Sequence, residues 1–471
     1  MLRNLFVIGI GILSFTWCEA QYISKVLEYT PAPGQFTNTL SWGSPHAASS
    51  ILGRLDGSLC LGAWGGYVVF QFEDPVENHP DNPYGVDFTI FGNPMAHWSE
   101  PGVVRVMKDE NSNGLPDDTW YELAGSDHYF STTIRNYQLT YVNPGDTLAR
   151  EVPWSDSHGG SGFIKTNSAH TQPYYPLQDS FPHISPEQYT LTGTWIPGAV
   201  DVDHPSVLNS ASRAFGYADN HLRGQMDLNL PDNPYTHAIE NSGGDAFDID
   251  WAVDSSGSYV DLDRIHFVQV QNALQADGKW LGELSTEICG ARDVNPDPGV
   301  GGELNLIVIR DLPAEISSGE YQMEVYVFYR GRIVQNPDVI WTTSSEEVIV
   351  DEGHVLRASA SGPVNLSASL ASMAHIKTSV STTIQLEFST GRKVIRKDSE
   401  IQLYPNPARD LVQLNGVELA TLSLLTPDGK PMMKVEEYKG GSIDISTLPP
   451  GMYIIGIDQG SSKHCLKLIK E

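Results

Sequence analysis

An acidic loop in the first quarter of the chain carries the side chains with the clearest chemical pattern. Counted from Asp109, oxygen-bearing side chains fall at loop positions 1, 3, 5, 9 and 10, and a glycine falls at position 6. Hard cations such as calcium take about six to eight oxygen ligands, and alternate spacing in a tight loop turns those oxygens inward. Gly114 permits the sharp turn, and a backbone carbonyl completes the set. The predicted metal ligands are Asp109, Asn111, Asn113, Leu115, Asp117 and Asp118.

This loop resembles the calcium loops of EF-hand, dockerin and thrombospondin-type repeats, with one departure. Position 12 is Trp120 instead of a bidentate Glu, so Asp117 or Asp118 would have to close the ligand shell. The alternative is a metal-free hairpin turn rich in Asn and Asp. We favour calcium, because five oxygens at this spacing are rare in a plain turn. Trp120 in place of Glu favours a structural calcium site over a switching one.

A second acidic cluster lies at residues 243–251. In a strand over 247–253, Asp248 and Asp250 share one face, whereas Phe247, Ile249 and Trp251 share the other. Two carboxylates on one side would suit a second metal or an acid–base pair, although a solvated outer face is the commoner explanation. For a polysaccharide hydrolase, the candidate carboxylates are Glu100, Asp245, Asp248 and Asp250.

Long loops carry aromatic and histidine side chains that would stack on a sugar or another flat ligand if they are exposed. The alternative is that each aromatic side chain anchors its loop to the core. The predicted ligand-binding residues on these loops are His97, Trp98, Trp154, His158, Tyr174 and Tyr175.

The elements that must position these residues are predicted to be strands. Val68, Phe70 and Phe72 alternate with polar neighbours, which indicates a strand with one buried face. The acidic loop lies between two such strands and connects them as a hairpin. The chain is therefore predicted to be all-β, with a helix only at 210–217. The predicted strands are 66–73, 86–92, 102–108, 119–124, 136–142, 187–193, 247–253, 264–271, 305–309, 321–329, 347–350 and 383–388.

Three β-domains are predicted to follow a signal peptide at residues 1–20. The first is a large jelly-roll-like domain or β-sandwich at 21–298, the second a smaller immunoglobulin-like sandwich at 301–392, and the third a C-terminal sandwich at 393–471. The signal peptide follows from a basic start, a short apolar run and small residues before the cleavage site. Cys60 and Cys289 either pair or remain buried thiols, and the sequence leaves both alternatives open.

The net charge of −29 restricts the partners. Residues 391–471 hold eleven basic and ten acidic residues, so the negative charge lies in the rest of the chain. This sign disfavours nucleic acid and anionic lipid as partners and suits calcium or a cationic or neutral ligand. Solubility alone is the simpler explanation of much of the charge.

The C-terminal motifs carry the most specific resemblance. Tyr-Pro-Asn-Pro at 404–407, Asp-Gly-Lys at 428–430, the run at 444–453 and a basic end at 465–470 occur in this order. Together they resemble the type A C-terminal sorting domain of the type IX secretion system of Bacteroidota. The resemblance implies a compact β-sandwich, the type IX machinery as a partner, and passage through the periplasm to the outer cell surface or the medium.

The main body is similar, more loosely, to uncharacterised cell-surface proteins of Bacteroidota. The similarity rests on residues 99–102, 109–126, 244–249 and 281–287. Some such proteins accompany outer-membrane nutrient receptors, including corrinoid receptors, which implies a receptor of this kind as a partner.

Three hypotheses for function follow. The first is a non-enzymatic, calcium-stabilised binding protein that captures a nutrient, either a glycan or a corrinoid. The second is an adhesin or structural surface protein, and the third is a secreted polysaccharide hydrolase. The sequence has no G-x-S-x-G, H-E-x-x-H or P-loop motif, which removes several common enzyme classes and makes a non-enzymatic function the first choice.

Overall fold

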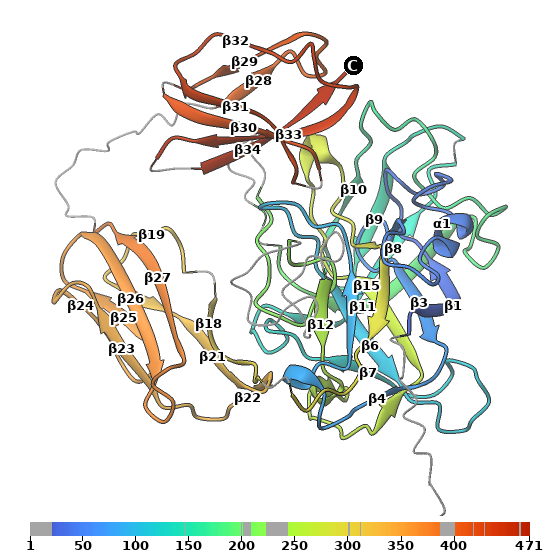
Figure 1. Ribbon diagram of the computed structural model, residues 1–471, viewed down its shortest axis with the longest axis horizontal. Coiled ribbons are helices and arrows are strands. Elements are labelled where there is room, and N and C mark those ends of the chain that lie inside the picture. The colour runs from blue at the N-terminus through green and yellow to red at the C-terminus, as the bar shows by residue number, and fades with distance from the viewer. Residues whose placement is uncertain are drawn as a thin grey trace, which may run out of the picture.

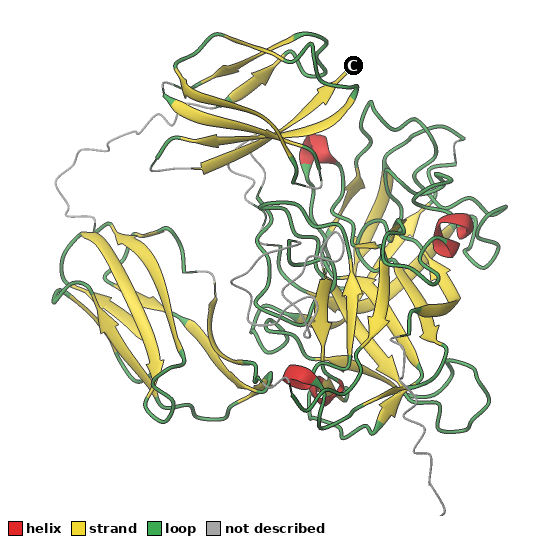
Figure 2. Ribbon diagram, in the orientation of Figure 1, coloured by secondary structure: helices red, strands yellow, loops and turns green. Residues whose placement is uncertain are grey.

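The structure is a computed structural model that describes residues 21–145, 147–198, 200, 209–222, 244–299, 302–310, 312–386, 401–417, 419–427, 429–460 and 463–471. The predicted signal peptide lies outside these residues. Strands dominate the described chain, as Figure 2 shows, so the all-β prediction is confirmed. Within the described residues, no helix is long and apolar enough to cross a membrane.

The main body is built on a six-stranded antiparallel sheet with the order β1-β3-β15-β6-β7-β13 (Figure 1). Val68, Phe70 and Phe72 of β3 are buried, as their alternation predicts, and they share a core with Val268 and Val270 of β15. The strands are β1 (Ile23–Thr30), β3 (Tyr67–Phe72), β15 (Phe267–Asn272), β6 (Gly102–Met107), β7 (Trp120–Leu123) and β13 (Ala252–Val253).

A four-stranded sheet with the order β10-β9-β8-β11 adds to the same core. Tyr137, Leu139 and Tyr141 are alternate residues of β8, and all three are buried. The hydroxyl of Tyr141 donates to the backbone carbonyl of Trp64 at 2.8 Å, which joins the sheet to the loop before β3. The two sheets therefore enclose one apolar core. The strands are β10 (Ser161–Ile164), β9 (Val152–Asp156), β8 (Ile134–Val142) and β11 (Gln188–Trp195).

Shorter ladders bring distant segments together beside this core. The sheet β12-β5-β17 joins residues from three regions of the chain, and Phe88 of β5 stacks on Phe247 of β12 at 5.3 Å between ring centroids. Two-stranded ladders pair β2 with β16 and β4 with β14. The strands are β12 (Gly244–Phe247), β5 (Phe88–Phe91), β17 (Gly290–Asp293), β2 (Leu59–Cys60), β16 (Glu287–Ile288), β4 (Val76–Glu77) and β14 (Arg264–Ile265).

The sheet β18-β21-β22 packs on both of its faces. Leu306 and Phe328 belong to the core of the main body, whereas Ile307 and Val327 pack with Ala368 of the second unit. Side chains alternate between the faces of a strand, so this sheet joins two cores. The strands are β18 (Asn305–Arg310), β21 (Glu324–Tyr329) and β22 (Arg332–Ile333).

The rest of the second unit consists of two further sheets with the orders β19-β27-β26-β23 and β20-β25-β24. Val364, Leu366 and Leu356 lie in a core between these strands. The strands are β19 (Glu315–Ile316), β27 (Lys377–Ile384), β26 (Gly362–Leu370), β23 (Val339–Thr343), β20 (Glu320–Gln322), β25 (Val355–Ala358) and β24 (Val348–Val350).

The C-terminal unit has a separate core between two sheets with the orders β28-β29-β32 and β31-β30-β33-β34. Val412, Ile445, Ile455 and Leu468 are among its most buried residues. The strands are β28 (Gln402–Tyr404), β29 (Leu411–Asn415), β32 (Ser442–Asp444), β31 (Pro431–Tyr438), β30 (Ala420–Leu425), β33 (Gly451–Asp458) and β34 (Lys463–Lys470).

Three predicted elements are wrong in detail. Residues 210–217 form no helix. The strand at 247–253 is interrupted by the 3-10 turn η2 (Ile249–Trp251), because the carboxylate of Asp248 caps the turn by accepting from the N–H of Asp250 at 2.7 Å. Of the strand predicted at 383–388, residues 383–384 are the end of β27, which begins at Lys377, and residues 387–388 lie outside the described residues. The other helical segments are α1 (Pro45–Ser49), η1 (Pro83–Gly85) and η3 (Lys279–Leu281).

Candidate functional site

Three carboxyl groups from distant parts of the chain meet inside the main body. Glu100, Asp219 and Glu287 each offer an oxygen, and these oxygens lie within 4.8 Å of one another. Glu100 precedes β6, Glu287 begins β16, and Asp219 lies in a loop segment with a φ of 57°. Asp219 and Glu287 are buried, and Glu100 is half-buried. We call these three residues the carboxylate triad.

Backbone donors fix the orientation of the triad. The N–H groups of Asn93 and Glu287 donate to the Oδ1 and Oδ2 atoms of Asp219, both at 2.8 Å. The N–H of Ser285 donates to Oε1 of Glu100 at 2.8 Å. Space is tight, because a Cβ atom on Gly92 would lie 2.2 Å from Oδ1 of Asp219. The site therefore requires glycine at position 92.

The triad concentrates negative charge in a buried place. Burial raises the pKa of Glu100 to about 7, although N–H donors from Ser285 and Trp98 lower it. Burial, and then the charge of Glu100, raise the pKa of Asp219 and of Glu287 well above the ordinary range. Near neutral pH the metal-free triad therefore retains protons. A divalent cation would replace those protons, and an all-carboxylate donor set fits a hard ion such as calcium.

A buried thiol, that of Cys60, lies beside the triad. Sγ of Cys60 lies 2.9 Å from Oγ of Ser285, and burial raises the pKa of the thiol to about 12. Without a metal this group is therefore protonated at neutral pH, whereas thiolate is the metal-binding form. Cys60 and Cys289 are both buried and are not joined in a disulfide, which decides between the two alternatives that the sequence leaves open.

A pocket of about 380 Å³ adjoins the triad. Its lining includes Ser99 and Asn220, the chain neighbours of Glu100 and Asp219. Oγ of Ser99 donates to the carbonyl of Asn220 at 2.6 Å, and the N–H of Asn220 donates to Oδ2 of Asp245 at 2.9 Å. The bond between Ser99 and Asn220 joins the two segments of the pocket wall that carry Glu100 and Asp219. The remaining lining residues are Met95, Ala96, His97, Asn209, Ser210, Ala211, Ser212 and Leu222.

The structure gathers the side chains of the predicted calcium loop around the hairpin turn between β6 and β7. The carboxylate of Asp109 accepts from the N–H groups of Asn113 and Gly114 at 3.1 and 2.8 Å. The amides of Asn111 and Asn113 both donate to Oδ1 of Asp117 at 3.2 Å. The carboxylate of Asp118 also accepts from the Asn111 amide, at 3.4 Å, and Leu115 is exposed. Gly114 has a φ of 73°, as the sharp turn requires.

Most of the predicted ligand-binding aromatics are not exposed. Trp98, Tyr174 and Tyr175 are buried, which favours the alternative that these side chains anchor their loops to the core. Trp154 is half-buried and packs over Gly162, and the exposed His158 stacks on Tyr137. His97 alone of the six lines the pocket beside the triad.

The second acidic cluster divides between two sites. Asp245 faces the segment that follows Asp219, where its Oδ1 lies 2.7 Å from Nδ1 of His221. Asp248 and Asp250 instead line a separate cleft. The sequence points to Glu100 as a carboxylate candidate and to Glu287 through the resemblance at 281–287, but no local signal distinguishes Asp219.

Comparison with known proteins identifies the C-terminal unit. Residues 402–471 match the family model of the secretion system C-terminal sorting domain. They form a type IX secretion sorting domain. The chain is therefore exported to the outer cell surface or secreted, and the sorting domain implies interaction with the type IX machinery. No curated protein matches the chain.

The solved structures that match the chain do so with low TM-scores and low sequence identity. Extracellular domains 3–5 of Drosophila OTK match with a TM-score of 0.17 and 10% identity over 45% of this chain and 82% of that one. Domains 4–9 of the surface layer protein SbsC match with a TM-score of 0.16 and 9% identity over 47% of this chain and 44% of that one. The four N-terminal immunoglobulin domains of a Dscam1 isoform match with a TM-score of 0.13 and 12% identity, over 44% and 57% of the two chains.

The Tyr-Pro-Asn-Pro motif of the sorting domain has a structural role. The amide of Asn406 donates to the carbonyl of Lys467 at 2.7 Å, and its Oδ1 accepts from the N–H of Ile469 at 2.8 Å. One side chain thus satisfies two backbone groups of the last strand, β34, which explains why the motif and the C-terminal end occur together.

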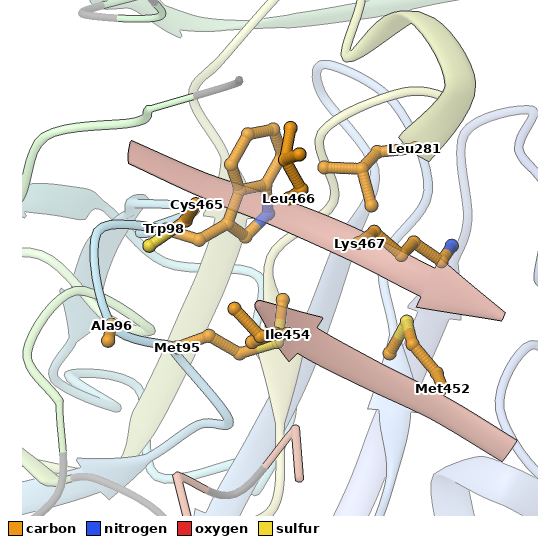
Figure 3. A pocket seen from close by; sticks show the side chains of 9 residues that line it. All are labelled: Met95, Ala96, Trp98, Leu281, Met452, Ile454, Cys465, Leu466 and Lys467. Carbon is orange, nitrogen blue, oxygen red and sulfur yellow. The ribbon is translucent and has the colours of Figure 1, made fainter. Parts of the chain in front are cut away.

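The sorting domain also lies close to the pocket loop. Figure 3 shows Met95 and Trp98 of the main body facing Ile454 and Leu466 of the sorting domain, where these side chains line a cavity of about 30 Å³. Met95 belongs to the lining of both this cavity and the pocket beside the triad. The contact therefore lies near the wall of the pocket.

Proposed function

We propose that the main body is a cation-stabilised binding module that works at the outer cell surface and captures a nutrient. The observation that carries this proposal is the position of the buried carboxylate triad against a pocket of about 380 Å³. A cation on Glu100, Asp219 and Glu287 would tie together three chain segments, two of which also line the pocket. Cation binding and pocket shape would then be coupled.

Calcium is the proposed cation at two places with different roles. In the hairpin, Asp109, Asn111, Asn113, Asp117 and Asp118 surround one turn, and calcium there would stiffen the link between β6 and β7. In the triad, calcium would offset buried charge and hold the pocket segments in register. The first role is local, whereas the second bears on ligand binding.

The proposed ligand is a glycan fragment or a corrinoid, taken up together with an outer-membrane receptor. The pocket volume lies at the lower end of small-molecule sites, which favours a glycan fragment over the larger corrinoid macrocycle. Serine, asparagine and histidine side chains at the pocket match sugar hydroxyls. Hydrolysis is less well supported, because Asp219 and Glu287 are buried and a substrate bond would not reach between them.

The proposed binding of calcium is tested by calorimetric titration of calcium into the EDTA-treated full chain, with thermal unfolding in parallel. We expect Asp219→Asn to remove one binding event and most of the calcium-dependent rise in melting temperature, and Asp109→Ala to remove the other event. Asp179→Asn, at an exposed carboxylate outside both places, is the matched control. Equal calcium binding by wild type and Asp219→Asn would overturn a role for the triad.

The ligand part is tested by retention of the calcium-loaded chain on a glycan array and on immobilised cobalamin. His97→Ala, in the pocket lining, should weaken retention, and His158→Ala, on an exposed loop outside that lining, should not. Unchanged retention of both variants on every bound ligand would contradict the assignment of this pocket.

A further inference from the structure

A second cleft, independent of the triad, lies where the main body meets the sheet β18-β21-β22. It has a volume of about 590 Å³. Its main-body wall includes Asn78, Asn82, Asp248 and Asp250, and Glu303 and Arg330 stand on the other side. Sites between domains are a common location for small-molecule binding.

The main-body wall presents two neighbouring carboxyl groups, those of Asp248 and Asp250. Asp248 caps η2 through its Oδ1 atom, and its Oδ2 faces Gly85, where a Cβ atom would lie 2.6 Å away. Asp250 accepts from the amide of Asn78 at 3.0 Å. Behind them lies the buried Asp87. Burial, and then the charges of Asp87 and Asp250, raise the pKa of Asp248 well above its ordinary value, so a cation in the cleft would stabilise the ionised form of this carboxyl group.

An unpartnered acceptor in the same wall points to a ligand. Asn82 is 6% exposed, and its amide nitrogen donates to Oδ1 of Asp87 at 2.7 Å. In this orientation of the amide, the nitrogen faces the carboxyl group of Asp87 and the oxygen faces away from it. The Oδ1 atom of Asn82 is then left buried without a hydrogen-bond partner. A buried acceptor without a donor is costly, and Asn82 lines the cleft from which a ligand would supply one.

We propose that this cleft binds a small organic cation that bears primary ammonium groups. Such a ligand supplies N–H donors to Asn82 and positive charge to Asp248 and Asp250. A single metal ion fits less well, because the group with three ligand oxygens within 4.8 Å among the described residues is the triad, not this wall. The volume of about 590 Å³ is that of a small-molecule site. At the rim, Arg330 is paired with Glu303 at 3.2 Å. Arg332, whose charge lowers the pKa of Asp248, is paired with Asp261 at 3.4 Å.

The test is calorimetric titration of 1,4-diaminobutane into the full chain, with 1,4-butanediol as the neutral isostere and calcium as the competing cation. We expect the diamine to bind and the diol not to bind. Asp248→Asn should weaken diamine binding at least about tenfold, through loss of a charge-assisted hydrogen bond. Asn caps a helical turn as well as Asp does, so the fold of this variant should be retained.

Further variants separate this site from the triad. Asp250→Asn should also weaken diamine binding, and this change keeps an oxygen for the Asn78 amide if Asp248→Asn fails to fold. Asp179→Asn and the triad variant Asp219→Asn should bind the diamine as the wild type does. Equal binding of the diol, full displacement of the diamine by calcium, or unchanged binding in both Asp248→Asn and Asp250→Asn would overturn the proposal.

Discussion

Oδ2 of Asp219 accepts a hydrogen bond from the backbone N–H of Glu287 at 2.8 Å, across 68 residues of sequence. The same two residues contribute carboxyl groups to the triad. One bond thus fixes the backbone of one acidic residue against the side chain of another, which holds like charges together. Because burial raises the pKa of Asp219 and Glu287, we expect the stability of the main body to depend on pH and on cations.

Stability without metal should fall as the pH rises from about 5 to 8. Burial raises the pKa of Glu283 to about 8 and that of Glu100 to about 7, whereas an unfolded Glu titrates near about 4.3. The folded state then holds more protons, so these groups stabilise it fully below about pH 4, and this contribution is lost as the pH rises through the folded pKa values. The expected slope is up to about 1.4 kcal/mol per pH unit per group.

Urea unfolding in EDTA at several pH values measures this slope. Glu283→Gln should reduce the slope, because a glutamine side chain does not titrate. The fold should be retained, because the glutamine oxygen still accepts from the N–H of Gln35, which donates to Oε1 of Glu283 at 2.7 Å. Glu352→Gln, at an exposed position, should leave the slope as in wild type. A stability that rises with pH between 5 and 8 in EDTA would show that the acidic core does not act in this way.

The hairpin turn should be sensitive to the backbone conformation at Gly114. Its φ is 73°, and a Cβ atom there would meet no neighbour within 4 Å. Gly114→Ala should therefore cost about 1–2 kcal/mol through backbone strain alone, and it should weaken calcium binding at the loop. Gly114→Asn should cost less, because Asn tolerates this conformation. Equal stability of wild type and Gly114→Ala in urea unfolding would contradict the turn geometry.

Removal of the Phe328 ring should destabilise the junction between the main body and the second unit. Phe328 is buried in the main core and packs edge-on against Phe215, with 5.0 Å between ring centroids. Phe328→Ala should cost about 3–5 kcal/mol in urea unfolding. Tyr329→Ala, at the next and largely exposed residue, is the control and should cost much less. Similar losses in both variants would argue against two-faced packing of this sheet.

Export should depend on the amide of Asn406. Asn406→Ala leaves two backbone groups of β34 without their partner and should cost about 1–3 kcal/mol in the sorting domain. We expect the chain to accumulate in the periplasm, as measured by fractionation and surface labelling. Asn415→Ala, at an exposed position on β29, is the control and should be exported normally. Export of Asn406→Ala at the wild-type level would contradict a role of the Asn406 amide in export.

Local patterns predict much of the fold. The alternation of Val68, Phe70 and Phe72 correctly indicates a strand with a buried face, because side chains alternate along any strand. The acidic loop lies in a hairpin, as its flanking strands predict. The sorting domain is recognisable because its motifs lie within 402–471. Patterns that fail are those that a single contact reverses, as where the cap at Asp248 ends a strand.

The sequence by itself determined that this protein is an all-β chain with a sorting domain for export, and that its oxygen-rich loop is a hairpin. Only the tertiary structure decided that Tyr174 and Trp98 are buried and that Glu100, Asp219 and Glu287 meet. The physical reason is distance along the chain. Secondary structure and contiguous motifs arise from neighbouring residues, whereas burial and buried charge clusters arise from pairings between segments far apart in the sequence, such as Cys60 with Glu287.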